Sequence, residues 1–454
     1  MASAFGIAYA VEMYAFSIRS QVLRISPSWQ RALACLLLFL LACPPPLEAY
    51  SVLSHQAIID AVWEANLKPL LKKRFPKATE DELSGAQAYA YGGSIIQDMG
   101  YYPYGSPFFS NLTHYVRGGD FIQAMLRDAQ DLNEYAFALG SLAHYAADND
   151  GHRLATNLAV PILYPKLKKK FGDQVTYEDD PLAHVKTEFG FDVLQVARER
   201  YAPDSYHDFI GFEVSQPLLD RAFQETYGLE VKAVLLNENK ALESYRRDVS
   251  KLIPRATKIA WSLKQDEIKG DIPDMTRKKF LYNLSRSNYE KEWGKEYVRP
   301  SATDQFLAVL YQIVPKFGPL RVLQFKSPTP QTENMFEASF NATLDRYRLL
   351  LKEEAKGHLQ LKNDNFDLGV LAEPGKYRLN DETQAKLLHK LVEQKVNAIN
   401  PKIRGELLQF FSSPDAPYAM KNNPKAWAQV QEDLAALKNL PDSREEAVSG
   451  EGSH

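Results

Sequence analysis

Apolar residues recur at three- and four-residue spacing along most of the chain, the periodicity of helices that bury one face. Alternating apolar and polar positions, which would predict strands, are scarce, and no repeat of fixed period is present. We therefore predict an all-α protein. The predicted helices cover residues 56–71, 121–127, 132–147, 183–201, 212–236, 241–263, 305–314, 335–351, 383–398 and 426–437.

Clusters of turn-forming residues divide these helices and suggest a domain boundary. The loop at 270–274 follows the end of one apolar pattern, so we place the boundary after residue 262. The prediction is a helical domain at 50–262, a second and mostly helical region of unknown role at 263–440, and a polar, disordered tail at 441–454. The other predicted loops lie at 101–111, 327–332, 363–380 and 412–417.

The first 49 residues have the pattern of a secretory signal peptide. Three arginines precede a short apolar run at 32–41, and the small residue Ala49 precedes a suitable cleavage site. The run is about half the length of a membrane-spanning helix. We predict signal peptide 1–49, a mature chain that begins at Tyr50, and a secreted or periplasmic protein. The alternative is a lipoprotein anchored at Cys43, because an apolar run also precedes that cysteine.

Composition excludes some partners and some kinds of reaction. The net charge of −3 predicts no basic surface, so no nucleic-acid partner is expected. The chain has two cysteines, Cys35 and Cys43, and cleavage before Tyr50 removes both. The mature protein would then have no disulfide, no thiol nucleophile and no thiolate metal site.

Histidines and carboxylates occur in two helical patterns. His144, Asp148 and His152 are spaced i, i+4, i+8, which places three ligand-type side chains on one helix face. His184 and Glu188 repeat the i, i+4 spacing. Alone, the first pattern is also compatible with a hydrogen-bonded core network, and the second with a surface ion pair.

Three further candidates precede these patterns: His55, Asp98 and His114. The complete set offers eight nitrogen and oxygen ligands of the types that zinc accepts. Eight are too many for one tetrahedral site and favour a metal cluster bridged by a carboxylate.

The order Asp, His, His-x-x-x-Asp, His, His-x-x-x-Glu resembles the zinc-dependent phospholipase C family, over roughly residues 50–261. Relatives of that family include the amino-terminal domain of glycosylphosphatidylinositol-specific phospholipase D and the single-strand-specific fungal nucleases. The resemblance implies a phospholipase C/nuclease-like helical domain holding two to three zinc ions (Zn2+). The implied metal ligands are Tyr50 (through its free amine), His55, Asp98, His114, His144, Asp148, His152, His184 and Glu188.

The resemblance also implies roles and a reaction. Asp148 would bridge two metals, and Asp98 and Asp148 are the predicted catalytic residues. The chain departs from the family pattern at Tyr50, where a Trp is usual, and in the spacing on either side of His152. The implied enzyme is a zinc-dependent phosphodiester hydrolase that acts on phospholipid at a membrane surface.

Two alternatives remain at this point. The aromatic stretch 101–109 could cage a quaternary ammonium group or stack on bases, but loop packing onto the core is the favoured explanation. A single-strand nuclease or nucleotidase of the same fold is therefore the second enzyme hypothesis. A metal-stabilised helical binding protein without catalytic activity is the third, which turnover of bis-p-nitrophenyl phosphate would exclude.

Overall fold

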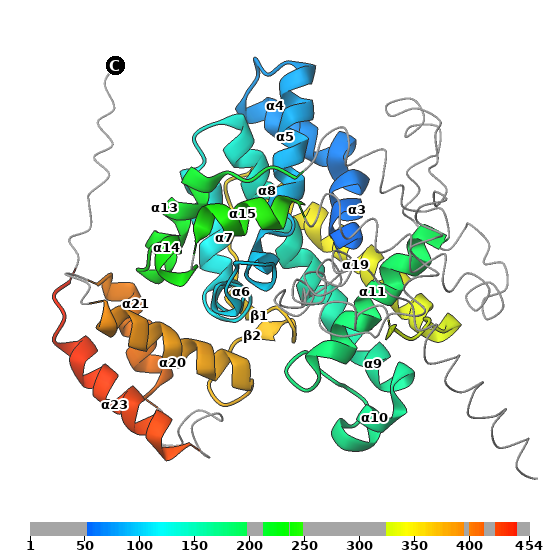
Figure 1. Cartoon of the computed structure of the whole chain (residues 1–454). Coiled ribbons are helices and arrows are strands. Elements are labelled where there is room, and N and C mark those ends of the chain that lie inside the picture. The colour runs from blue at the N-terminus through cyan, green and yellow to red at the C-terminus, as the bar shows by residue number, and fades with distance from the viewer. Residues whose placement is uncertain are drawn as a thin grey trace, which may run out of the picture.

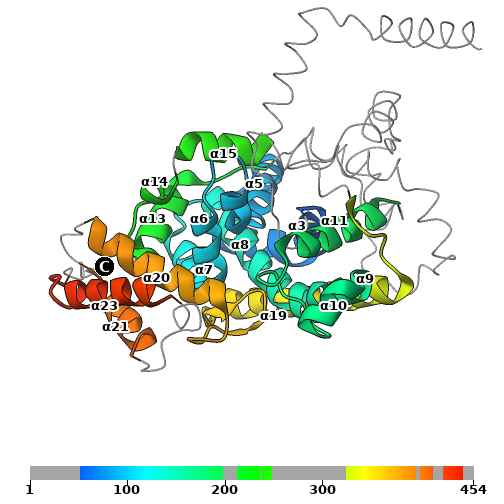
Figure 2. The same ribbon diagram turned by 60° about the horizontal axis from the view of Figure 1, so that its bottom comes forward.

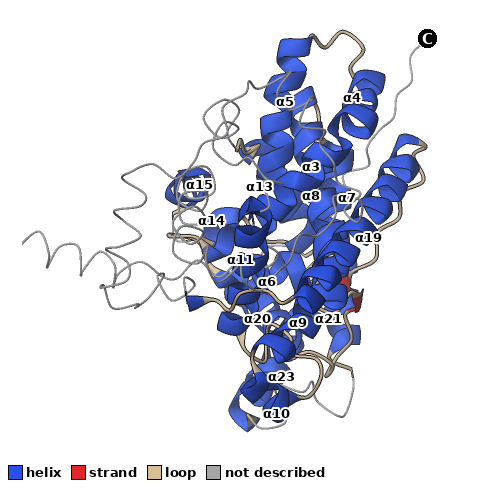
Figure 3. Cartoon of the chain, turned by 90° about the vertical axis from the view of Figure 1, so that its right-hand side faces the viewer, coloured by secondary structure: helices blue, strands red, loops and turns tan. Residues whose placement is uncertain are grey.

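The computed structural model describes residues 52–197, 212–235, 237–247, 324–394, 399–412 and 423–442. Within these residues the regular structure is almost entirely helical, and the two strands have two residues each (Figure 3). The all-α prediction is therefore confirmed. The predicted signal peptide, Tyr50, the boundary after residue 262 and the predicted helix at 305–314 lie outside the described residues.

The elements follow one another in a simple order. In chain order they are α3 (Val52–Val62), η1 (Trp63–Leu67), α4 (Lys68–Arg74), α5 (Glu80–Gly93), η2 (Ile96–Tyr101), α6 (Pro107–Tyr115), α7 (Gly118–Asp128), α8 (Leu132–Gly151), η3 (His152–Thr156), α9 (Asn157–Leu163), α10 (Pro165–Phe171), α11 (Pro181–Ala197), α13 (Gln216–Tyr227), α14 (Val231–Val234), α15 (Glu238–Arg247), α19 (Pro330–Ala355), β1 (Asp364–Asn365), β2 (Val370–Leu371), α20 (Arg378–Glu393), α21 (Pro401–Phe410) and α23 (Pro424–Lys438).

Helix α8 is the centre of the fold. The Asp131 side chain caps its start by accepting a hydrogen bond from the Glu134 amide. The helix then contacts α3, α5, α7 and α19, and Figure 1 shows these elements around it. A Cβ atom at Gly140 would lie 2.1 Å from the Ala90 carbonyl oxygen, so only glycine permits the close approach of α5 and α8.

Two sequence predictions differ from the structure in detail. The predicted loop at 101–111 contains the start of α6, because Pro107 occupies the first helical turn, where a missing amide hydrogen costs nothing. The predicted helix at 212–236 is two helices, α13 and α14. Gly228 ends the first in the left-handed conformation, with φ +68°.

The described part of the carboxyl-terminal region packs onto the same apolar core as the amino-terminal domain. Helix α19 lies against α8, and the Phe336 ring of α19 stacks on Phe191 of α11, with 4.9 Å between the ring centroids. Helices α20, α21 and α23 lie at the opposite end of the molecule from α9 and α10 (Figures 1 and 2). One contiguous core therefore contains residues from Val52 to Leu437.

The beginning of the predicted disordered tail is ordered. The Ile399 amide donates a hydrogen bond of 2.9 Å to the carbonyl oxygen of Pro441, and Arg404 forms an ion pair with Asp442. The rest of the tail, 443–454, lies outside the described residues. Among the helices that the structure describes, none is both long and apolar enough to cross a membrane.

Candidate metal centre

Five of the predicted ligands meet beside α8. His144 and Asp148 lie one turn apart on this helix, His114 lies near the end of α6, Asp98 lies in the 3₁₀-helix η2, and His55 lies on α3. All five side chains are at most 1% exposed. Because burying several charged and polar groups together is costly, such a cluster requires either mutual pairing or a bound cation.

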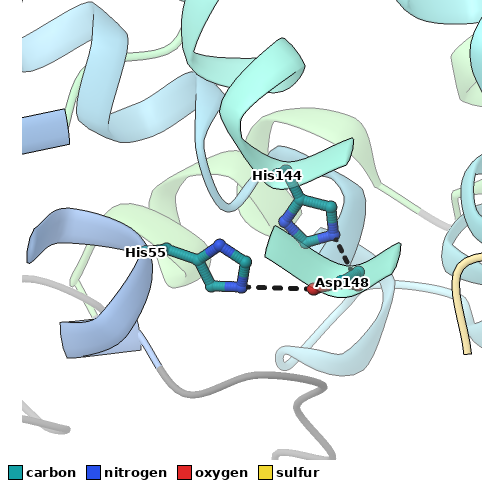
Figure 4. Close-up of side chains that lie close together, drawn as sticks. All are labelled: His55, His144 and Asp148. Atoms are coloured by element: carbon teal, nitrogen blue, oxygen red, sulfur yellow. Dashed lines mark ion pairs between the residues drawn. The ribbon is translucent and has the colours of Figure 1, made fainter. Parts of the chain in front are cut away.

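The Asp148 carboxylate is at the middle of this first cluster. Its Oδ1 atom lies 3.5 Å from Nε2 of His55, and its Oδ2 atom lies 3.1 Å from Nε2 of His144 and 3.3 Å from Nε2 of His114. Figure 4 shows the His55 and His144 imidazoles converging on it. Asp98 Oδ1 lies 3.2 Å from Nε2 of His114. The two oxygens of Asp148 therefore face different histidines, an arrangement that suits a bridging carboxylate.

Backbone carbonyls determine which nitrogen of two imidazoles faces the cluster. Nδ1 of His144 lies 2.9 Å from the Ser94 carbonyl oxygen, and Nδ1 of His114 lies 2.7 Å from that of Ser110. A carbonyl oxygen only accepts, so each Nδ1 carries a hydrogen and each neutral ring directs its Nε2 lone pair inward. The two Nε2 atoms are 3.1 Å apart, too close for two lone pairs without a shared cation or proton.

The electrostatics of the cluster favour one positive charge at its centre. Burial lowers the pKa of His114, but Asp148 and Asp98 outweigh burial and raise that pKa to about 10. Burial and the nearby His144 lower the pKa of His55 well below its usual value. Burial opposes ionisation of Asp148, but His144 and its neighbours hold the pKa of this carboxyl well below the usual range. A divalent cation would satisfy the same preference as a proton on His114.

A second cluster contains His152, His184 and Glu188. Glu188 Oε1 lies 2.9 Å from Nε2 of His184 and 3.3 Å from Nε2 of His152, and all three side chains are at most 2% exposed. Burial lowers the pKa of His152, but Asp148 and Glu188 raise it to about 9. Burial raises the pKa of Glu188, yet His184 and His152 lower it below its ordinary value. This cluster too brings together carboxylate and imidazole groups that could hold a metal ion.

The structure brings eight of the nine predicted ligands into these two clusters. Each of three ligand groups has its donor atoms within 4.8 Å of one another: His55, His144 and Asp148; Asp98, His114 and His144; and His152, His184 and Glu188. The ninth predicted ligand, Tyr50, lies outside the described residues, two positions before the start of α3.

Asp192 holds the start of α3 in place. Its Oδ2 atom accepts a hydrogen bond of 3.0 Å from the Leu53 amide, and its Oδ1 atom accepts one of 2.8 Å from the Ser54 hydroxyl. Because α3 carries His55 and α11 carries Asp192 next to the second cluster, this contact couples the amino end of the described chain to both ligand groups.

The aromatic stretch 101–109 mainly fills the core. Tyr102, Phe108 and Phe109 are buried, whereas Tyr104 is 53% exposed. Tyr101 is the member of this stretch that borders the first cluster, with 6.2 Å between its ring centroid and that of His114. Loop packing therefore explains most of these residues.

Sequence reasoning missed one segment of the site, the hairpin formed by β1 and β2. Its Phe366 ring lies against His114, with 5.6 Å between centroids, and Asp367 Oδ1 lies 3.4 Å from Nδ1 of His152. The hairpin falls in a region that shows only turn-forming residues and no periodicity. Nothing in its spacing therefore links it to residues far earlier in the chain.

Comparison with known proteins agrees with this geometry. Residues 54–237 match the family model described as zinc dependent phospholipase C. No curated protein and no solved structure matches the chain. The matched segment contains all eight ligand-type residues of the two clusters, whereas the hairpin lies beyond it. Residues 54–237 are therefore a domain of the zinc-dependent phospholipase C family.

Proposed function

We propose that this protein is a secreted, zinc-dependent phosphodiester hydrolase that cleaves phospholipids in the manner of a phospholipase C. The observation that carries the proposal is the Asp148 carboxylate, which faces three imidazoles from three different helices inside a domain of this family. A structural ion pair would need one histidine. Three histidines with a second buried carboxylate, Asp98, form the donor set of a metal centre.

The residues present fit zinc in number and chemistry. We assign Asp98, His114, His144 and Asp148 to one ion, and His152, His184 and Glu188 to another. His55, with the Tyr50 amine and Asp148, is assigned to a third. The carboxylate oxygens of Asp98, Asp148 and Glu188 are buried and receive no well-formed hydrogen bond from the described residues, as expected of metal ligands.

The reaction follows from these assignments. Bound zinc ions would activate a water molecule near neutral pH and neutralise charge on the phosphodiester oxygens. Asp148 would connect the two ligand groups of the first cluster, because its Oδ1 faces His55 and its Oδ2 faces His114 and His144. Asp98 is assigned as a ligand rather than a general base, because a carboxylate that binds zinc is a weak base. No nucleophilic thiol or serine is required.

A phospholipid substrate is supported by the family of the domain and by the net negative charge of the chain, which disfavours nucleic acid. A lipid at a membrane surface is the corresponding partner. The secreted or periplasmic location rests on the signal-like pattern of residues 1–49.

A comparison of substrates tests this proposal. The zinc-reconstituted protein is incubated with phosphatidylcholine vesicles, phosphatidylinositol vesicles and single-stranded DNA at equal phosphodiester concentration. We expect lipid cleavage to be faster than DNA cleavage, with diacylglycerol and a phosphorylated head group as products. Phosphatidate as the product would reassign the reaction to D-type cleavage. A nuclease rate above both phospholipase rates would replace the proposed substrate.

A further inference from the structure

The hairpin formed by β1 and β2 is fixed firmly against the metal centre. The Phe366 amide donates a hydrogen bond of 3.1 Å to the carbonyl oxygen of His114, and β1 contacts both α6 and α7. On its other side, a Cβ atom at Gly369 would lie 2.4 Å from the Asn149 carbonyl oxygen of α8. Gly369 also has φ +65°, a conformation that favours glycine. Both the close approach and the backbone conformation therefore require glycine at this position.

Within this hairpin, Asp367 is held by one of its carboxylate oxygens. Oδ2 accepts hydrogen bonds from the Tyr377 hydroxyl at 2.6 Å and from the Tyr177 amide at 2.9 Å. The other oxygen, Oδ1, receives no hydrogen bond from the residues that the structure describes and lies 3.4 Å from Nδ1 of His152. The residue is 1% exposed. An immobilised, buried carboxylate therefore directs one oxygen at the ring nitrogen of His152 that faces away from Glu188.

The corresponding nitrogens of two other histidines face backbone carbonyls. Nδ1 of His114 faces that of Ser110 in the same helix, and Nδ1 of His144 faces that of Ser94. His152 lies where α8 changes into the π-helix η3, and a carboxylate from the distant hairpin occupies the equivalent position beside its Nδ1. Histidine ligands of metals commonly donate their second nitrogen to such a carboxylate, which fixes the tautomer and the ring orientation.

We propose that Asp367 is a positioning residue for His152, so that the carboxyl-terminal region completes the second ligand cluster. Asp367 keeps the hydrogen of His152 on Nδ1 and directs Nε2 toward Glu188 and His184. The separation of 3.4 Å is a few tenths of an ångström longer than a hydrogen bond, a gap that a small rotation of the ring on ligation closes. The inference rests on the metal-binding part of the proposed function.

Zinc affinity is the direct test. The full-length mature protein, Asp367→Asn and the control Asp364→Asn are titrated against a chromophoric chelator, and bound zinc is counted by elemental analysis. Asp364 belongs to the same hairpin and is also buried, but its Oδ2 accepts a hydrogen bond from the Tyr145 hydroxyl. We expect Asp367→Asn to weaken the binding of one zinc ion by about 10- to 100-fold and to leave the affinity for the other ions unchanged. Asp364→Asn should stay within about twofold of the parent protein.

A second variant guards against misfolding. Tyr377→Phe keeps the Asp367 carboxylate but removes one of the two hydrogen bonds that hold it. It should therefore weaken the binding of the same zinc ion by a smaller factor. Parent-like affinity in Asp367→Asn and in Tyr377→Phe, with parent-like melting temperature at saturating zinc, overturns the inference. If Asp367→Asn does not fold, the affinity of Tyr377→Phe alone decides. A parent protein that binds no zinc instead refutes the proposed metal-dependent function, which is a separate failure.

Discussion

Replacing Asp148 by asparagine should lower phosphodiesterase activity more than replacing His55 by alanine. The substitution keeps the size of the side chain and removes its charge. In the structure this charge lies within 3.5 Å of Nε2 of His55, 3.3 Å of Nε2 of His114 and 3.1 Å of Nε2 of His144. Asp148→Asn therefore perturbs both ligand groups of the first cluster, whereas His55→Ala perturbs one.

The magnitude follows from counting the groups affected. Even indirect partners of a metal typically account for about 10- to 100-fold in affinity or activity. A loss of about tenfold at each of the two groups multiplies to at least about 100-fold for Asp148→Asn, or about 2.7 kcal/mol of activation free energy. His55→Ala should lower the activity by about tenfold.

The assay is turnover of bis-p-nitrophenyl phosphate at saturating zinc, with melting temperatures measured in parallel. Asp150→Asn is the matched control, because Asp150 lies on the same helix but forms ion pairs with Arg153 and Arg346. We expect the control to retain activity within a few-fold. A loss in His55→Ala equal to or greater than that in Asp148→Asn would mean that the assignment of Asp148 as the bridge is wrong.

Three further predictions concern the metal, the pH and the chain terminus. The purified protein should contain two to three zinc ions, and a chelator should lower both activity and melting temperature; no bound metal after reconstitution would refute this. In the metal-free protein, His114 and His152 have raised pKa values, so their protonated forms stabilise the fold. This contribution is complete below about pH 6.5 and is lost as the pH rises through about 9 to 10. A melting temperature that increases over pH 7–10 in the presence of chelator would contradict this prediction. Intact-mass analysis of the exported protein should show a chain beginning at Tyr50, whereas a lipid-modified Cys43 would overturn both that terminus and the third metal ion.

The central helix and the ligand-type residues on it could be predicted because they depend on residues close together in the sequence. The spacing of His144 and Asp148 reports one helix face directly, and α8 follows the predicted apolar pattern. The helix α6 was missed in part because proline and glycine near its start are also loop residues. Pro107 then begins the helix rather than preventing it.

Asp367 could not be predicted from the sequence. It is one of 57 acidic residues, and its segment has no periodicity that would place it on a particular face. Its role depends on a contact with His152, which lies 215 residues earlier in the chain (367 − 152), and on packing that puts Gly369 against α8. Such tertiary contacts depend on the packing of the whole core, so the spacing of residues along the chain does not predict them.

The position of the hairpin also sets the order in which the centre is completed during synthesis. A ribosome produces His55 to Glu188 first, and Asp367 only after more than a hundred further residues. A chain that stops before the hairpin therefore contains all eight ligand-type side chains but lacks the carboxylate beside His152. With Asp367 in the proposed role, such a fragment would bind the zinc ion of the second cluster more weakly than the complete chain does.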